Sequence, residues 1–300
     1  MISILIPTYN YNVYPLVTEL KKQANSLSIP YEILIQDDAS TLFLKENESI
    51  NSLENCVYAL NPENLGRGNN INALNSKAKF GYVLILEADA FPENDNYLEP
   101  FIKSISDKTQ LVFGGVGYPE TKPNSEQLLR WKYGKERESI TIEARLKNPY
   151  HFVFTWNLLV KKEILSQNPF PVSVKEYGYE DVVFIKKLKT QNVNIQHIEN
   201  RLIHFNNEES IVFIQKTEKA VRTLKQLLEN KELTYEDTRL SKTYSQLRHL
   251  GLEKGIAFLF RKLSKRMLSN LTSHNPSLIV LDLYKLGSFC SLDTQKQPTK

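Results

Sequence analysis

The sequence of 300 residues contains only two cysteines, Cys56 and Cys290, which lie far apart in the chain. Two thiols are too few for a disulfide framework or a structural zinc site, which indicates a reducing compartment. No run of about 18 apolar residues occurs, so no transmembrane helix is expected. The first residues lack a basic leader, a long apolar segment and a small-residue cleavage site, so no signal peptide is expected either. We therefore expect a cytoplasmic protein.

Basic charge is concentrated near the C-terminal end. The whole chain carries a net charge of +4, with 41% hydrophobic and 24% charged residues, which is ordinary for a globular protein. Residues 241–300 contain ten Lys or Arg and three Asp or Glu, a net +7, so residues 1–240 carry −3. This asymmetry predicts an acidic surface partner for the tail and argues against a nucleic-acid-binding body.

Two carboxylates follow an unbroken apolar run at residues 82–86. Such a run is typical of a strand that is buried on both faces, and Glu87 and Asp89 come directly after it. Ligands bind beyond the carboxyl ends of parallel strands, and paired carboxylates are costly to hold together without a cation or a proton. The pair predicts a divalent-metal site for a phosphate-bearing ligand, and a solvated strand exit is the alternative.

The N-terminal half alternates between predicted strands and helices, which indicates βαβ units with a mostly parallel sheet. Polar residues follow the first two strands: Pro7 and Tyr9 come after the first, and Asp37 and Asp38 after the second. The two aspartates fit either nucleoside recognition or a role as turn and capping residues. The predicted strands are residues 2–6, 31–35, 56–60, 82–86, 111–117, 152–160 with an interruption at 155–157, and 193–198, and a further short segment follows at 201–206. Helices are expected after about residues 16, 66 and 97.

A second acidic motif lies at residues 176–184. Gly178 allows a sharp turn, and Glu180 and Asp181 then open a predicted helix. Acids in a first helical turn are favoured by the helix dipole, which is the structural interpretation of this pair. The functional interpretation makes Asp181 a general base.

Four segments together resemble family-two glycosyltransferases of the GT-A fold. They are residues 4–10 (ILIPTYN), 32–40 (EILIQDDAS), 64–69 (NLGRGN) and 86–92 (LEADAFP). The resemblance implies an α/β, Rossmann-like domain that binds a nucleotide-sugar donor. Its implied donor-binding residues are Pro7, Tyr9, Asp37, Asp38, Arg67, Glu87 and Asn157. The family's Asp-x-Asp metal motif appears here with Glu87 in place of the first Asp.

The resemblance also implies a catalytic set. Asp89 and His204, with Glu87, would hold Mn²⁺ or Mg²⁺, and an imidazole ligand favours Mn²⁺. Asp181 would take the proton of the acceptor hydroxyl during an inverting displacement, and its neighbour Glu180 would assist binding. Asn157 would stand beside the donor sugar, although Phe154, Thr155 and Trp156 replace the small residues that are usual there.

The predicted organisation has two parts. Residues 1–207 would form the catalytic domain, with a donor-binding half at 1–117 and an acceptor-binding half at 118–207, and residues 208–300 a basic helical extension. Within the extension, residues 255–268 fit an amphipathic helix whose apolar stripe is formed by Ile256, Leu259, Phe260, Leu263 and Met267. Peripheral contact with an anionic membrane on its inner face, packing on the catalytic domain and contact between two copies stay open as alternatives.

The sequence therefore predicts a metal-dependent inverting hexosyl- or N-acetylhexosaminyltransferase. A UDP-sugar is the expected donor and a glycan or lipid-linked molecule the expected acceptor, as in bacterial surface-polysaccharide synthesis. Two alternatives are a degenerate nucleotide-sugar-binding or scaffold protein and a sugar nucleotidyltransferase. A nucleotidyltransferase would want a basic glycine-rich loop after the first strand, where this chain has Pro-Thr-Tyr-Asn.

Overall fold

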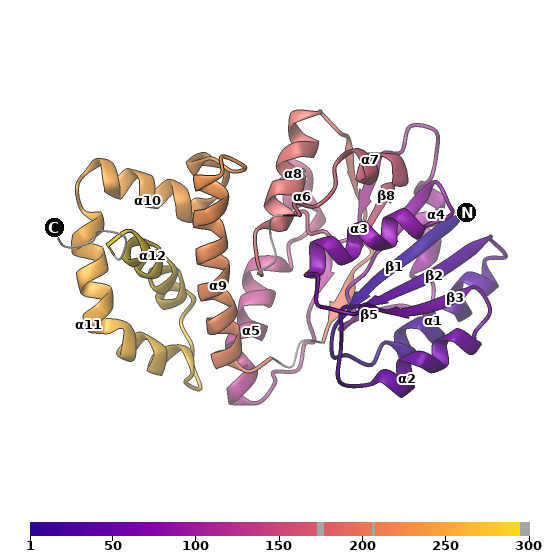
Figure 1. Cartoon of the computed structure of the whole chain (residues 1–300), viewed down its shortest axis with the longest axis horizontal. Helices are drawn as coiled ribbons and strands as arrows, with labels where there is room; N and C mark the ends of the chain where they lie inside the picture. The colour runs from indigo at the N-terminus through magenta and orange to yellow at the C-terminus, as the bar shows by residue number, and fades with distance from the viewer. Residues whose placement is uncertain (173–176, 206–207, 295–300) are drawn as a thin grey trace. The chain divides into compact units, whose positions relative to one another are not determined.

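The computed structural model describes residues 1–172, 177–205 and 208–294, with side chains to residue 292. The chain divides into two compact units (Figure 1). The first contains Met1–Pro119, Lys135–Lys175 and Phe184–Asn206, and the second contains Glu120–Gly134, Glu176–Val183 and Asn207–Lys300. The second unit thus takes in two stretches that the sequence placed in the acceptor-binding half. The predicted boundary at residue 207 and the start of the acidic motif, Glu176, lie outside the described residues.

A seven-stranded sheet forms the core of the first unit, in the order β3-β2-β1-β4-β8-β6-β9. The strands are β1 (Ile2–Thr8), β2 (Tyr31–Asp37), β3 (Cys56–Leu60), β4 (Tyr82–Ile85), β6 (Leu111–Phe113), β8 (Leu158–Lys161) and β9 (Ile195–His197). Every residue of β1 and β2 is buried, as expected for central strands that are covered on both faces. Only β8 runs antiparallel to its neighbours, so the predicted mostly parallel α/β sheet is confirmed.

A second, three-stranded sheet has the order β5-β10-β7 and contains β5 (Ala90–Pro92), β7 (Val116–Gly117) and β10 (Leu202–His204). The single strand predicted at residues 111–117 is therefore wrong, because it divides between the two sheets. Gly114 and Gly115 separate the halves, and Gly115 has a φ of +92°, which a strand does not adopt. The strand predicted at 152–160 is also shorter than expected, because only Leu158–Lys161 pairs in the sheet.

The helices of the first unit are α1 (Tyr14–Ser26), α2 (Leu44–Glu48), α3 (Arg67–Lys77), α4 (Leu98–Ser104), α6 (Ile142–Lys147) and α7 (Lys162–Gln167), and α8 (Glu180–Thr190) begins in the second unit. Helix α1 carries Pro15 in its first turn, where the missing N–H costs nothing. Its buried side chains Leu16, Val17 and Leu20 share one face, and both α1 and α3 pack on the sheet. These packed layers hold the carboxyl ends of the strands in place.

The second unit is helical in its described residues, as predicted for the C-terminal region. Its helices are α5 (Leu128–Tyr133), α9 (Ser210–Glu229), α10 (Arg239–His249), α11 (Glu253–Leu271) and α12 (Leu278–Thr294), coloured orange to yellow from α9 onward in Figure 1. A cluster of buried apolar side chains joins α5, α9, α11 and α12, with Phe260 and Met267 packed against it. The predicted single stripe on α11 is therefore wrong: Phe260 and Met267 face this core, whereas Leu259 and Leu263 are exposed.

Candidate functional site

The carboxyl ends of β2, β1 and β4 lie side by side at one edge of the main sheet. The N–H of Asp38 donates to Thr8 O (2.9 Å), and the N–H of Leu86 donates to Leu5 O (3.0 Å), so pairing continues beyond the strands. Pro7 is buried near the end of β1, and Tyr9, which follows the strand, is 56% exposed. Open parallel sheets bind their ligands at this edge, so the structure brings the predicted donor-binding loops together there.

Asp38 organises the loop that leads into α3. Its Oδ1 accepts hydrogen bonds from Asn61 Nδ2 (3.0 Å) and the N–H of Leu65 (2.8 Å), and its Oδ2 accepts from the N–H of Gly66 (2.9 Å). Gly66 has a φ of +83°, a conformation that glycine adopts readily, and α3 begins at the next residue, Arg67. Asp38 therefore fixes the backbone from which the Arg67 side chain reaches the site.

Asp37 serves the turn that follows β2. Its side chain is fully buried, where Oδ1 accepts from the N–H of Ser40 (2.8 Å) and Oδ2 from the Tyr58 hydroxyl (2.7 Å). Burial, and then the neighbouring Asp37, raises the pKa of Tyr58. The structure thus gives Asp37 the turn role that the sequence left open, and it leaves this carboxylate no exposed surface for a ligand.

Arg67 joins α3 to the segment that follows β4 and to the segment that precedes β8. Its Nε contacts Glu87 Oε1 at 2.9 Å, its Nη1 donates to Thr155 Oγ1 (2.9 Å) and its Nη2 donates to Thr155 O (3.1 Å). The Arg67 and Glu87 side chains are each only 22% exposed. Burial raises the pKa of Glu87, and the charge of Arg67 opposes that rise. The guanidinium of Arg67 is therefore a charged partner of Glu87, and the metal-binding role of Glu87 stays a prediction.

Asp89 and His204 meet through the pairing of the second sheet. His204 on β10 lies opposite Ala90 on β5, and the N–H of Phe205 donates to Asp89 O (2.9 Å). This register places His204 Nε2 at 3.1 Å from Asp89 Oδ1. The imidazole is 6% exposed, and its Nδ1 has no hydrogen-bond partner among the described residues. Two predicted metal ligands from distant parts of the sequence therefore lie together.

The two atoms are close enough for a direct ion pair, and their separation also fits a shared cation. Adjacent ligands of an octahedral ion at about 2.1 Å lie about 3 Å apart. A carboxylate and an imidazole are also ligands that Mn²⁺ accepts. The described residues contain no group of three His, Cys, Asp or Glu that could hold a metal, so the place of Glu87 in such a set stays a prediction. Asp89 and His204 are the residues that fit such an ion.

Aromatic side chains surround His204. The ring of Trp156 lies 5.2 Å from the imidazole and that of Tyr118 5.5 Å from it, and the Tyr118 hydroxyl donates to Glu138. Burial, and then the charge of Asp89, raises the pKa of Tyr11. The sequence pointed to Trp156 only as a replacement for a small residue and gave no sign of Tyr11, Tyr118 or Glu138, since each contact joins segments that are far apart in the chain.

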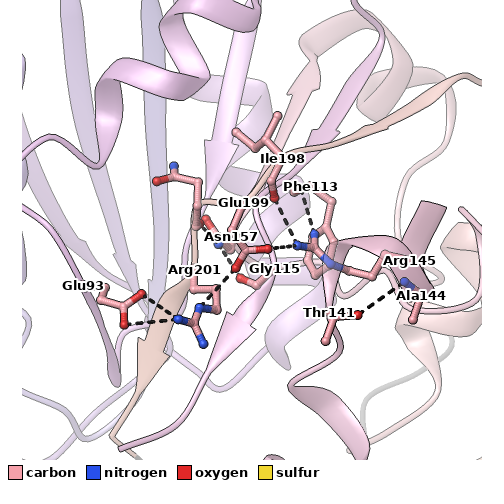
Figure 2. A network of polar contacts seen from close by, with 11 residues as sticks. Glu93, Phe113, Gly115, Thr141, Ala144, Arg145, Asn157, Ile198, Glu199 and Arg201 are labelled. Carbon is pink, nitrogen blue, oxygen red and sulfur yellow. Dashed lines mark hydrogen bonds and ion pairs between the residues drawn. The ribbon is translucent and has the colours of Figure 1, made fainter.

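Asn157 lies in a buried network rather than at an open surface (Figure 2). Its Nδ2 donates to Gly115 O (2.6 Å) and Asn200 O (2.8 Å), and its Oδ1 accepts from the Tyr97 hydroxyl (2.6 Å). The side chain is 0% exposed, and its φ is +54°. The predicted contact of Asn157 with a donor sugar is therefore not available in this arrangement, in which Asn157 ties β8 to the segments that precede β7 and β10.

Arg145 extends this network, and nothing in the sequence pointed to it. Its side chain is 1% exposed, and its Nη2 contacts Glu199 Oε2 and donates to Ile198 O, both at 3.1 Å (Figure 2). A Cβ at Gly115 would lie 2.8 Å from Arg145 Nη2, and the φ of +92° at this position strains any other residue, so a substitution would have to displace the guanidinium group. Glu199 also pairs with Arg201 (3.2 Å). These contacts hold the turn between β9 and β10, and β10 carries His204.

Glu180 and Asp181 stand in the first turn of α8, as predicted, and belong to the second unit. Glu180 is 9% exposed, and its Oε2 accepts from the N–H of Gly178 (3.0 Å). Gly178 has a φ of +112°, and a Cβ there would lie 2.6 Å from Ala220 Cβ. Glycine is therefore needed for the turn that starts this helix. The catalytic role of Asp181 stays a prediction.

Comparisons with known proteins place this arrangement in a family. The model of the family described as "Glycosyl transferase family 2" matches residues 3–168, more than half of the chain. No curated protein matches.

Solved structures show the same fold. The chain resembles S. aureus TarS 1–349 in complex with UDP-GlcNAc, with a TM-score of 0.51, 17% identity and coverage of 100% of this chain and 93% of that one. It also resembles the mannosyltransferase PcManGT from Pyrobaculum calidifontis in complex with GDP-Man and Mn²⁺, with a TM-score of 0.52, 18% identity and coverage of 76% and 64%. A match to a longer S. aureus TarS chain (TM-score 0.50, 20% identity) covers 72% of this chain and 38% of that one, so this chain spans less than half of that protein's length.

These likenesses establish the GT-A fold that the resemblance implied, with its mostly parallel sheet and helical C-terminal region. The family model covers the ends of β1, β2 and β4, the start of α3 and the acidic motif at Glu87 and Asp89. The chain belongs to glycosyl transferase family 2.

Proposed function

We propose that this protein transfers a hexosyl or N-acetylhexosaminyl group, with inversion, from a UDP-sugar to a glycan or a lipid-linked acceptor. The observation that carries the proposal is the pair formed by Asp89 and His204, 3.1 Å apart, at the edge of a parallel sheet where ligands bind. Family membership, and similar structures solved in complex with UDP-GlcNAc and with GDP-Man, support a nucleotide-sugar donor.

The proposed nucleoside pocket lies over the ends of β1 and β2. Tyr9 would offer its exposed ring to the base, and Pro7 would shape the pocket floor. Asp38 would act mainly through the loop that it holds, since both of its oxygens already accept hydrogen bonds. Asp37 and Asn157 enter the proposal only as residues that hold the surrounding backbone.

The proposed diphosphate site lies at Asp89 and His204. A Mn²⁺ or Mg²⁺ held there would supply positive charge to the leaving diphosphate. Arg67 brings a second positive charge nearby, which Glu87 partly neutralises in the absence of donor. Phosphate oxygens bind arginine strongly, so a bound diphosphate would compete with Glu87 for the guanidinium group.

The proposed general base is Asp181. An acceptor hydroxyl would lose its proton to this carboxylate while its oxygen attacks the anomeric carbon from the face opposite the leaving diphosphate. Such assistance typically contributes about 10² to 10⁴ in rate. Glu180 would hold the acceptor or the donor sugar, because its carboxylate lies one residue away in the same helical turn.

A donor screen tests the proposal. The protein is incubated with UDP-, GDP- and dTDP-sugars and Mn²⁺, and both hydrolysis of each donor and the melting temperature are measured. A ligand that binds only the folded state raises its melting temperature. We expect UDP-sugars to give the largest shift, and EDTA to reduce it. Equal, negligible shifts with all three donors, together with no hydrolysis, would contradict the proposal.

A binding protein without transferase activity is the second candidate. The ion pair between Arg67 and Glu87 favours this candidate, because Glu87 stands at the first acidic position of the metal motif and its carboxylate contacts Arg67. Turnover separates the two candidates: a binding protein would show a donor-dependent melting shift without release of UDP, whereas the transferase would release UDP and transfer the sugar when the acceptor is supplied.

A further inference from the structure

Helix α11 has an unusual distribution of charge. Between Lys254 and Leu271 it contains no acidic residue, and its basic residues in this stretch are Lys254, Arg261, Lys262, Lys265 and Arg266. The helix's one acid, Glu253, has a carboxylate oxygen buried in the second unit, where its charge adds to the burial that raises the pKa of Cys290 to about 11. The solvent-facing side of α11 therefore carries positive charge without acidic neighbours on the same helix.

The opposite face of α11 fixes how the helix is oriented. Ala257 and Leu271 are fully buried, and the Phe260 ring lies 5.0 Å from that of Tyr284 on α12. A Cβ at Gly287 would lie 2.5 Å from the Phe260 ring, so the two helices are in close contact there. One apolar side of α11 is therefore buried against the rest of the second unit, and other apolar side chains of the helix remain exposed at its surface.

That remaining surface is formed by three large apolar side chains. Phe258 is 50% exposed, Leu259 51% and Leu263 43%. Residues four apart lie one above the other on a helix, so Phe258, Lys262 and Arg266 form one row and Leu259 and Leu263 form the row next to it. The exposed apolar side chains and these basic ones therefore share one face. The Lys262 ammonium lies 4.6 Å from the centre of the Phe258 ring. We call the face formed by Phe258, Leu259, Lys262, Leu263, Lys265 and Arg266 the α11 outer face.

We propose that the α11 outer face binds the surface of an anionic lipid bilayer. Half-exposed Phe and Leu side chains lose their contact with water when they enter the boundary between headgroups and acyl chains, and the interleaved Lys and Arg remain beside anionic headgroups. No helix in the described ranges has both the length and the apolar character to cross a bilayer, so this contact is peripheral.

The charge of this face selects the lipid surface over a second copy of the chain. Two copies that met through their α11 outer faces would bring like charges together, which is unfavourable unless acids intervene. A nucleic acid would satisfy the cations but would leave the exposed Phe258 and Leu259 in water. An anionic bilayer matches both the apolar and the cationic side chains.

Vesicle co-sedimentation tests the proposal with the full chain. We compare vesicles of phosphatidylcholine alone with vesicles that contain 30% phosphatidylglycerol. We expect binding only to the anionic vesicles, and weaker binding as salt rises. The triple variant Lys262→Gln, Lys265→Gln, Arg266→Gln should bind about 100-fold more weakly, since each basic residue near such a surface contributes about a factor of five.

A matched control removes the same net charge elsewhere. Lys45, Lys108 and Lys189 are exposed residues of the first unit, and their replacement by Gln should change vesicle binding by less than about fivefold. Insertion is measured with Phe258→Trp, whose added fluorescence should be quenched by brominated lipid in anionic vesicles only. The proposal is overturned if wild-type protein ignores anionic vesicles, if the control variant loses as much binding as the α11 variant, or if Phe258→Trp is not quenched.

A separate measurement distinguishes contact between copies. Sedimentation velocity across a range of protein concentrations should show the same species for wild type and for Phe258→Ser with Leu263→Ser, while the double variant loses vesicle binding. A wild-type dimer that the double variant dissociates would overturn the lipid proposal and assign the α11 outer face to self-association.

Discussion

Replacing Asn157 with alanine should destabilise the first unit severely. The substitution removes three hydrogen bonds and leaves the Tyr97 hydroxyl, Gly115 O and Asn200 O in buried surroundings without that partner. A buried polar group left unpaired costs about 1–3 kcal/mol. Alanine must also adopt the φ of +54°, which costs about 1 kcal/mol or more. The expected loss in the free energy of unfolding is therefore about 4 kcal/mol or more, a large part of the usual total of about 5–15 kcal/mol.

Urea unfolding measures this loss. Trp156 belongs to the first unit and Trp131 to the second, so fluorescence in a Trp131→Phe background reports the first unit. Two further variants separate the causes: Asn157→Gly removes the same bonds without the strain at φ +54°, and Tyr97→Phe removes one bond, at an expected cost of about 1–3 kcal/mol. The structural role would be refuted if the free energy of unfolding of Asn157→Ala lay within about 1 kcal/mol of wild type while the KM for donor rose. That result would instead support the predicted contact of Asn157 with the sugar.

Three other predictions follow from the site and its surroundings. Glu87→Gln should lower the free energy of unfolding by about 1–2 kcal/mol, because it leaves the partly buried Arg67 without this counter-ion. The same variant should change the Mn²⁺ concentration for half-maximal activity less than threefold, and a change of tenfold or more would make Glu87 a metal ligand. Asp38→Ala should lower stability by about 2 kcal/mol and weaken UDP binding in calorimetry, since the loop before α3 loses its acceptor; unchanged values for both would contradict the role of Asp38. Burial raises the pKa of Cys56 to about 11, so the free energy of unfolding should fall as pH rises from the unfolded thiol's pKa towards 11. Cys56→Ala should reduce this dependence of the free energy of unfolding on pH, and an unchanged dependence would show that the thiol does not titrate there as described.

The central parallel strands could be predicted because each contains a short apolar run, Ile4–Ile6 in β1 and Ile33–Ile35 in β2. Ile2–Thr8 and Tyr31–Asp37 are wholly buried, and the polar Ser3 and Glu32 within them are hydrogen-bonded to each other (2.7 Å). The prediction failed at residues 111–117, where the hydrogen bond from the N–H of Asn200 to Gly114 O and the contact with Arg145 at Gly115 divide the run. Both contacts come from residues outside the predicted strand, and a local pattern contains no sign of them.

The same limit applied to the site. Adjacent strand ends were enough to bring Asp38, Arg67, Glu87 and Asp89 to one edge, because topology alone places them there. The partner of Glu87 could not be predicted, since Arg67 could equally have faced a ligand. Helix α11 has the predicted helical period, but its predicted stripe divides between packed Phe260 and Met267 and exposed Leu259 and Leu263. The side that packs on α12 depends on which helix lies next to it, and the sequence of α11 alone does not contain that information.

The transfer reaction itself is tested most directly at Asp181. Asp181→Asn keeps the size of the side chain and can still stabilise the first turn of α8, but it cannot accept the proton of an acceptor hydroxyl. We predict that the variant binds UDP and Mn²⁺ as wild type does, by the shift in melting temperature, while its transfer rate at saturating donor and acceptor falls by about 10² or more. Glu180→Gln is the matched control, with weaker substrate binding and a smaller loss of turnover. An Asp181→Asn variant that transfers sugar at close to the wild-type rate would contradict the account.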